Sequence, residues 1–135
     1  MNKLNLLLCV MGLSACGGGS STETAENTET TGAETQPGFQ TATVDEVEVA
    51  LANGALPVDA NSAENYEAHH IPGAVHARHD AISSEVLGAD QSRQLIFYCY
   101  NEQCMASHRA AEAAMGLGYS NVYVMPAGIA GWIAA

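Results

Sequence analysis

An apolar run that ends in a cysteine, Leu95–Cys99, constrains the fold more than any other stretch of this chain. Aromatic and branched side chains dominate it, which is typical of a buried β-strand. A polar segment follows as far as a second cysteine, Cys104, and the alanine-rich sequence Ala106–Leu117 then predicts a helix. The pattern therefore places Cys99 at the carboxyl end of a strand, covered by a loop and facing the amino terminus of a helix.

Strands and helices are predicted to alternate through the rest of the domain. Short apolar runs predict further strands within Phe39–Thr41, Ala55–Ala60, His69–His76 and Val122–Met125. Capping residues and helical spacing predict helices from Thr43 with a capping box to Glu46, from Asn61, over Asp80–Gly88 and over Ile129–Ala135. This order is typical of an α/β fold with a mainly parallel sheet and helices on both faces. Chemistry in such sheets lies at the carboxyl ends of strands, where Asp59 and Cys99 both fall. The glycines of Ala127–Gly131 are expected to serve turns and packing.

The amino-terminal part is predicted to lie outside the folded domain. Residues 1–15 resemble a bacterial lipoprotein signal peptide, with an apolar segment, Leu4–Leu13, that is too short to span a bilayer as a mature helix. The sequence LSAC ends in Cys16, which such signals lipidate. Because Gly17 rather than aspartate follows, we expect the outer membrane of the cell envelope, with the domain facing the periplasm. The alternative is an ordinary secretory signal cut near Ala15.

Residues 16–38 are predicted to be a flexible acidic linker, because they are rich in Gly, Ser, Thr and Glu and lack large apolar side chains. The folded domain then spans 39–135. A formal net charge of −11 argues against nucleic acid and against an anionic membrane surface, so membrane contact is expected through the lipid anchor only. Once the signal is removed and Cys16 is lipidated, Cys99 and Cys104 remain in an oxidising compartment. Their spacing leaves open whether they bond.

Four segments resemble the rhodanese-like domain, in that family's order: PVDANSAENYEAHHIPGAV, LIFYCYNEQC, ASHRAAEAAMGLGY and NVYVMPAGIAGW. They cover nearly all of residues 40–135. The resemblance implies a five-stranded α/β sandwich and sulfurtransferase activity, with Cys99 carrying sulfane sulfur as a persulfide. It implies a small sulfur donor, such as thiosulfate or a persulfide, and a thiol or cyanide-like acceptor. It implies no cofactor and no metal, and the sequence names no protein partner.

The residue chemistry agrees with this resemblance. The candidate active-site loop comprises Tyr100, Asn101, Glu102, Gln103 and Cys104. Sulfur transfer needs a thiolate, whereas an ordinary cysteine thiol has a pKa of about 8.5. Loop N–H groups converging on the sulfur, together with the positive end of the following helix, would lower that pKa at Cys99. A polar loop directly after the strand predicts an exposed sulfur; the alternative is a buried, inert core thiol.

The loop departs from the family's usual pattern at two positions. Members that act on phosphate have an arginine six positions after the cysteine, where this chain has Met105, so phosphatase activity is not expected. Sulfurtransferase members often have an arginine five positions after it, where this chain has Cys104, and this weakens the expectation of thiosulfate binding. Arg78, His108 and Arg109 are the candidates for binding substrate or stabilising the thiolate instead.

Other interpretations of the same residues remain open. Cys104 could resolve an oxidised or persulfidated Cys99 as a disulfide, which would make the chain a thiol redox or persulfide-relay protein. A metal site of Cys99, Cys104 and His108 is another alternative, and a non-catalytic rhodanese-like binding module is a third. Asp59-Ala60-Asn61 occupies the position where the family often has Asp-x-Arg, so Asn61 replaces the arginine. We expect Asp59 to be structural, accepting backbone hydrogen bonds.

Overall fold

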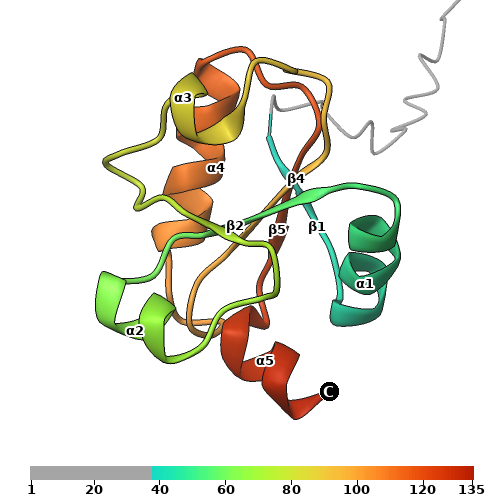
Figure 1. The fold of residues 1–135 in the computed structure, drawn as a ribbon, viewed down its shortest axis with the longest axis vertical. Helices are drawn as coiled ribbons and strands as arrows, with labels where there is room; N and C mark the ends of the chain where they lie inside the picture. Colours follow the sequence, from blue (N-terminus) through green and yellow to red (C-terminus); the bar gives the residue numbers. More distant parts are fainter. Residues whose placement is uncertain (1–37) are drawn as a thin grey trace, which may run out of the picture. The chain divides into compact units, whose positions relative to one another are not determined.

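The computed structural model describes residues 38–135. The predicted signal peptide, the predicted lipidation site at Cys16 and all but Gly38 of the predicted linker lie outside the described residues. Within 38–135 the chain forms one sheet with helices packed against it (Figure 1). None of the helices in this range is long and apolar enough to cross a bilayer.

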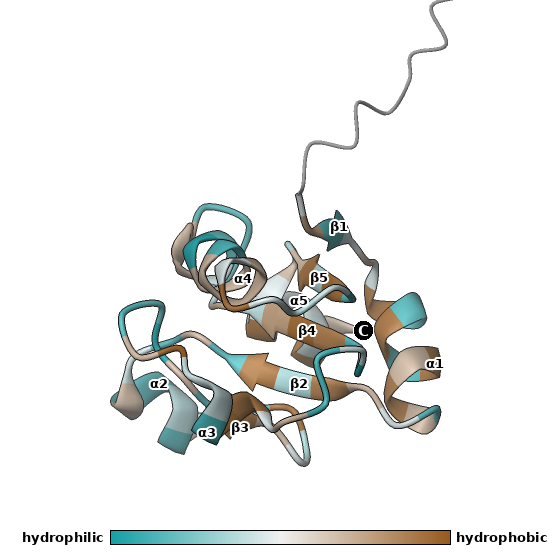
Figure 2. Ribbon diagram, turned by 90° about the horizontal axis from the view of Figure 1, so that it is seen from above, coloured by the Kyte–Doolittle hydropathy of each residue, from teal (hydrophilic) through white to brown (hydrophobic). Residues whose placement is uncertain are grey.

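A five-stranded sheet organises the domain, and every pair of neighbouring strands is parallel. The strands are β1 (Gln40–Thr41), β2 (Leu56–Asp59), β3 (Val75–His76), β4 (Leu95–Tyr98) and β5 (Val122–Met125). Their order is β1-β5-β4-β2-β3, so β4 is central and β1 lies at an edge. The predicted α/β class, the parallel sheet and the short edge strand near Phe39 are all confirmed. Figure 2 shows the apolar character of the central strands.

Helices cover both faces of this sheet. They are α1 (Val44–Ala52), α2 (Ala63–Ala68), α3 (Ser84–Leu87), α4 (Ala106–Gly116) and α5 (Gly128–Ala134). Side chains alternate along β4, as a pleated strand requires. Leu95 and Phe97 pack with the alanines of α4, whereas Ile96 and Tyr98 pack on the other face with residues of α1 and α5. Figure 1 shows α4 and α1 on opposite sides of the strands.

The starts of α1 and α2 test the predicted capping residues. At α1 the predicted capping box is confirmed: Thr43 Oγ1 accepts from Glu46 N–H at 3.3 Å, and Thr43 N–H donates to the Glu46 carboxylate at 2.8 Å. At α2 the prediction that Asn61 caps the helix is wrong. Ser62 is the cap and accepts from Asn65 N–H at 3.3 Å. Asn61 is 3% exposed and buried at the sheet edge, so it is not free to turn toward the helix.

The helix predicted over Asp80–Gly88 is shorter than expected. Only α3, from Ser84 to Leu87, is helical. The preceding residues form a turn in which Ala81 N–H donates to the Arg78 carbonyl at 2.9 Å, and this turn delays the start of the helix. Leu87 still contacts the core, with Ile82 and Val86 packed beside it as predicted.

Candidate functional site

Cys99 is the first residue after β4 and lies at the carboxyl edge of the sheet. The loop that follows Cys99 leads into the next helix, α4, which begins at Ala106. Asp59, the last residue of the neighbouring β2, lies in register with Tyr98. The strand, loop and helix predicted around Cys99 are therefore present in the predicted order.

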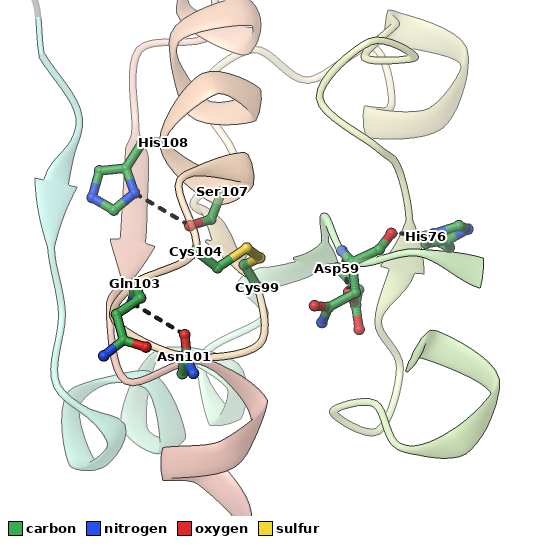
Figure 3. Close-up of a disulfide and its surroundings, with 9 residues drawn as sticks. Asp59, His76, Cys99, Asn101, Gln103, Cys104, Ser107 and His108 are labelled. Atoms are coloured by element: carbon green, nitrogen blue, oxygen red, sulfur yellow. Dashed lines mark hydrogen bonds between the residues drawn. A yellow bond between two sulfur atoms is a disulfide. The ribbon is translucent and has the colours of Figure 1, made fainter. Parts of the chain in front are cut away.

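Cys99 and Cys104 form a disulfide, shown in Figure 3, with their Cα atoms 6.1 Å apart. This separation is within the usual range for a bonded pair. Cys99 is only 2% exposed, whereas Cys104 is partly exposed. The expectation of an exposed Cys99 sulfur is therefore wrong for this disulfide form, because Cys104 and its loop lie over it.

Asn101 sets the shape of the loop. Its side-chain Oδ1 accepts from Gln103 N–H at 3.1 Å (Figure 3). Its carbonyl accepts from Cys104 N–H at 3.1 Å. Asparagine favours such turns because its side chain mimics a backbone acceptor. These bonds bring Cys104 back over Cys99. They also engage two N–H groups that were expected to converge on the sulfur, so that expectation is wrong for both of them.

The amino terminus of α5 holds the start of the same loop. Ile129 N–H donates to the Cys99 carbonyl at 2.8 Å, and Ala130 N–H donates to the Tyr100 carbonyl at 2.9 Å. Gly128 has φ +62°, and a Cβ there would lie 2.5 Å from the Tyr100 carbonyl carbon and oxygen. Sequence reasoning assigned these glycines to turns and packing and missed this contact with the loop. The glycines of AGIAG were the available signal.

The amino terminus of α4 faces the other end of the loop. Its cap residue, Met105, provides no side-chain hydrogen bond, unlike Thr43 and Ser62 at α1 and α2. The first N–H to bond back along the helix is that of Arg109, which donates to the Met105 carbonyl at 3.2 Å. The earlier N–H groups carry the positive end of the helix dipole. This end of α4 therefore favours an anion close to the cysteines.

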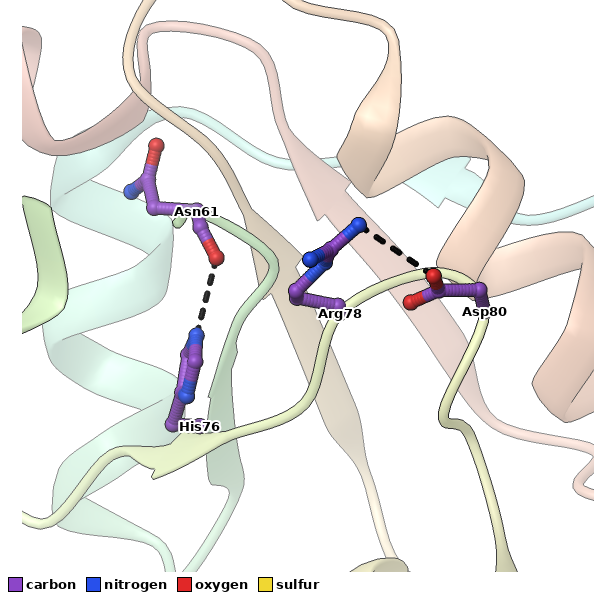
Figure 4. Close-up of polar contacts among 4 residues, drawn as sticks. All are labelled: Asn61, His76, Arg78 and Asp80. Carbon is purple, nitrogen blue, oxygen red and sulfur yellow. Dashed lines mark hydrogen bonds and ion pairs between the residues drawn. The ribbon is translucent and has the colours of Figure 1, made fainter. Parts of the chain in front are cut away.

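The three basic candidates have different surroundings. Arg78 pairs with Asp80 at 3.2 Å on the surface, with both side chains more than half exposed (Figure 4). His108 packs edge-on against Phe39, with ring centroids 5.2 Å apart, and its Nδ1 lies 3.5 Å from Ser107 Oγ. Arg109 is exposed on α4. Figure 3 places His108 beside the disulfide loop.

A polar cluster lies at the end of β2. Asp59 is fully buried, and its Oδ1 accepts from Asn61 N–H at 2.8 Å, which is the backbone bond predicted for it. His76 Nε2 donates to the Asn61 carbonyl at 2.8 Å (Figure 4). The His76 ring also stacks on Tyr66. Burial raises the pKa of the Tyr98 phenol, and the Asp59 carboxylate raises it further. This cluster joins β2, β3 and β4 beneath the site.

Comparison with known proteins decides the family. Residues 43–135, most of the chain, match the rhodanese-like domain. The chain belongs to the rhodanese-like family. Thiosulfate sulfurtransferase GlpE of Pseudomonas savastanoi pv. phaseolicola is 33% identical over 79 residues, which cover 58% of this chain and 73% of the relative. GlpE of Pseudomonas putida is 31% identical over 86 residues, covering 64% and 76% respectively.

Solved structures show the same fold. The human single-domain sulfurtransferase TSTD1 superimposes with a TM-score of 0.60 at 22% identity, over 72% of this chain and 97% of that one. The BH2092 protein of Bacillus halodurans gives a TM-score of 0.63 at 22% identity, over 73% of both chains. The rhodanese-like fold predicted from the four segments is thereby confirmed.

In this rhodanese-like domain, access to Cys99 is restricted. A cavity of about 270 Å³ lies beside the loop, lined by Asn101, Glu102, Gln103, Ala127 and Gly131. Neither cysteine lines it, so a substrate in this cavity would not contact the sulfur of Cys99. Cys99 can act as a nucleophile only after the disulfide is reduced, because only the free thiolate is nucleophilic.

The metal alternative finds no support in the part of the chain that the structure describes. Among residues 38–135, no three His, Cys, Asp or Glu side chains are grouped so that they could hold an ion. Cys99 and Cys104 are bonded to each other, and His108 packs against Phe39. The site that these residues form is therefore a dithiol–disulfide pair.

Proposed function

We propose that this rhodanese-like domain is a sulfurtransferase in which Cys99, freed from its disulfide, carries a sulfane sulfur. The observation that carries the proposal is the position of Cys99 between β4 and the amino terminus of α4, which has no side-chain cap. Helix amino termini stabilise thiolates and other anions. The relatives named thiosulfate sulfurtransferase support the same reaction class.

The proposed reaction has two transfers. The Cys99 thiolate attacks the outer sulfur of a donor, the donor's sulfur bond breaks, and the rest of the donor leaves with the electron pair. Cys99 then carries a persulfide. A nucleophilic acceptor, such as a thiolate, attacks the outer sulfur, and Cys99 leaves as a thiolate. A dithiol must first reduce the Cys99–Cys104 disulfide, since a disulfide sulfur is not a nucleophile.

The donor is proposed to be a low-molecular-weight thiol persulfide, such as glutathione persulfide, in preference to thiosulfate. From Cys99 to Met105 the sequence contains Glu102 and no Lys or Arg. Arg78, which follows β3, is paired with Asp80. A thiosulfate dianion would meet little fixed positive charge here beyond the end of α4, whereas the reacting group of a persulfide carries at most one negative charge.

A thiol redox function is the second candidate, because the two cysteines form a disulfide. In that function the pair would exchange electrons with another dithiol and carry no sulfane sulfur. The two candidates differ in one product, a persulfide on Cys99. This product is the basis of the test.

The test uses the full chain with Cys9→Ala and Cys16→Ala, so that Cys99 and Cys104 are the only thiols; this is the two-cysteine background. Reduced protein is incubated with thiosulfate or with glutathione persulfide, and its intact mass is measured at once. Loading should add one sulfur atom to Cys104→Ser, which lacks the second thiol, but none to Cys99→Ser. No added sulfur from either donor, with reversible disulfide formation retained, would favour the redox function.

We also propose that Cys16 is lipidated and holds the domain in the bacterial envelope, on the outer membrane facing the periplasm. The support is the sequence LSAC after a short apolar segment, with glycine following. Cys16→Ala should move the protein from the membrane fraction to the soluble fraction of cells. Unchanged partitioning would contradict the anchor.

A further inference from the structure

We propose that Cys104 expels the sulfur of a Cys99 persulfide as hydrosulfide, closing the Cys99–Cys104 disulfide in the same step. This rests on the proposed function, because it begins from the persulfide. It adds a fate for the sulfur that needs no external acceptor, and it makes a dithiol the second substrate. The persulfide and the disulfide would then be two stages of one cycle.

The loop places Cys104 where this attack requires it. The Cα atoms of the two cysteines are 6.1 Å apart, and their sulfurs are close enough to bond. Two hydrogen bonds to Asn101 hold the turn that brings Cys104 back over Cys99. Two further bonds from α5 fix the carbonyls of Cys99 and Tyr100. A nucleophile held in this way reacts as if present at very high concentration.

The disulfide identifies which sulfur is attacked. Attack by Cys104 on the outer sulfur of the persulfide would only move the persulfide to Cys104. Attack on the inner sulfur, Sγ of Cys99, forms the bond that the structure contains. Cys104 is therefore proposed to attack the inner sulfur. Hydrosulfide is a good leaving group in this attack, because its conjugate acid is more acidic than an ordinary cysteine thiol.

The step balances in atoms and electrons. The Cys104 thiolate forms a bond to Cys99 Sγ, and the bond between Sγ and the outer sulfur breaks. The outer sulfur leaves as hydrosulfide with the persulfide's proton and the electron pair of the broken bond. Two cysteines are oxidised to a disulfide, and the sulfane sulfur is reduced. An external dithiol then reduces the disulfide and is itself oxidised.

Burial of the two sulfurs fits the return step. Cys99 is 2% exposed and Cys104 is partly exposed, so a dithiol's thiolate reaches Cys104 first. The leaving group is then the Cys99 thiolate, next to the amino terminus of α4. Reduction through Cys104 thus restores Cys99 as the nucleophile for the next donor.

The experiment is a single turnover without added thiol. Reduced two-cysteine background is mixed with one equivalent of thiosulfate or glutathione persulfide, and hydrosulfide, sulfite and protein mass are followed. The background should release about one hydrosulfide per chain and end as the disulfide. Cys104→Ser should keep the persulfide and release hydrosulfide at least about tenfold more slowly until dithiothreitol is added. Cys104→Ala is the second variant, and Glu112→Ser, at an exposed position of α4 outside the loop, is the control and should behave as the background.

Two results would overturn the inference. Either the background keeps its persulfide until thiol is added, or Cys104→Ser and Cys104→Ala release hydrosulfide as fast as the background does. In both cases the proposed sulfurtransferase function stands, because the persulfide has formed. If no variant acquires a persulfide and no sulfite appears from thiosulfate, the proposed function itself has failed, and the inference fails with it.

Discussion

Cys99 and Cys104 are bonded to each other, but Cys104 lies between Cys99 and solvent. Cys99 is 2% exposed at the end of β4, and the partly exposed Cys104 is held above it by the turn at Asn101. Any reagent that approaches from solvent therefore meets Cys104 first. The two thiols of the reduced protein should differ in reactivity for this geometric reason.

Bulky thiol reagents should therefore discriminate between the two cysteines. In the reduced two-cysteine background, Cys99→Ser leaves Cys104 and Cys104→Ser leaves Cys99. An aromatic disulfide reagent should modify Cys104 at least about tenfold faster than Cys99 in the folded protein, because thiol reactivity follows access as well as thiolate content. In denaturant the two rates should converge. Equal rates in the folded state would contradict the burial of Cys99.

Gly128→Ala should damage the site through the backbone of the loop. The added Cβ would lie 2.5 Å from the Tyr100 carbonyl, and φ +62° is unfavourable for alanine. Either the loop moves or α5 does, and the bonds from Ile129 and Ala130 to the loop weaken. We expect a loss of more than about 2 kcal/mol in the free energy of unfolding. In the Cys104→Ser background, which keeps the persulfide, persulfide formation at Cys99 should fall with it, as measured by intact mass.

Gly116→Ala is the matched control for that variant. Gly116 is the last residue of α4, and a Cβ there would have no neighbour within 4 Å. Alanine restricts the unfolded chain and favours the helix, so stability should stay unchanged or rise by up to about 1 kcal/mol. In the Cys104→Ser background, persulfide loading should be the same with and without Gly116→Ala. If both glycine variants lose stability equally, the contact between Gly128 and Tyr100 does not explain the effect.

Local chemistry made much of this fold predictable. The capping box of Thr43 and Glu46 involves residues three apart, and the apolar runs of β4 and β5 are short and continuous. Asp59 and Cys99 were placed at strand ends because a parallel sheet brings those ends to one edge. These features follow from local sequence and from the geometry of parallel sheets, without knowledge of the tertiary contacts.

Tertiary contacts determine the features that the sequence did not predict. Asn61 and Ser62 are both good helix caps, and burial of Asn61 against His76 leaves the role to Ser62. The burial of Cys99 depends on the turn at Asn101 and on α5, which contacts the loop from a distant part of the sequence. Spacing alone could not determine whether Cys99 bonds to Cys104, since that requires the path of the loop between them.

Arg78→Gln tests whether the one basic candidate next to β3 serves the site. Its guanidinium is paired with Asp80 on the surface, where such ion pairs contribute about 0–1 kcal/mol. We expect the rate of persulfide formation from thiosulfate to change by less than about twofold, because Asp80 and solvent screen the Arg78 charge. Asp80→Asn, which removes the charged partner of Arg78, should also change this rate by less than about twofold. A tenfold or larger loss in Arg78→Gln alone would instead make Arg78 a donor-binding residue.

Tyr98 should make the domain sensitive to alkaline pH. Burial raises the pKa of its phenol above the ordinary value of 10.0, and the Asp59 carboxylate raises it further. A group whose pKa is raised by folding stabilises the protein fully below its unfolded pKa, and that contribution is lost as pH rises through the folded pKa. The free energy of unfolding should therefore fall as pH increases above 10.0, where the unfolded chain releases the proton and the folded chain retains it.

Tyr98→Phe separates this effect from the hydrogen bond that the hydroxyl accepts from Ile71 N–H at 3.0 Å. Loss of that bond should cost about 1–3 kcal/mol at neutral pH, because the Ile71 N–H is left buried and unpaired. Above 10.0, however, the variant should lose stability less steeply than the parent, since it has no phenol to deprotonate on unfolding. Urea unfolding of both proteins across this range, with the disulfide intact, measures the two slopes. Parallel slopes would mean that the environment of Tyr98, including Asp59, does not hold the phenol neutral.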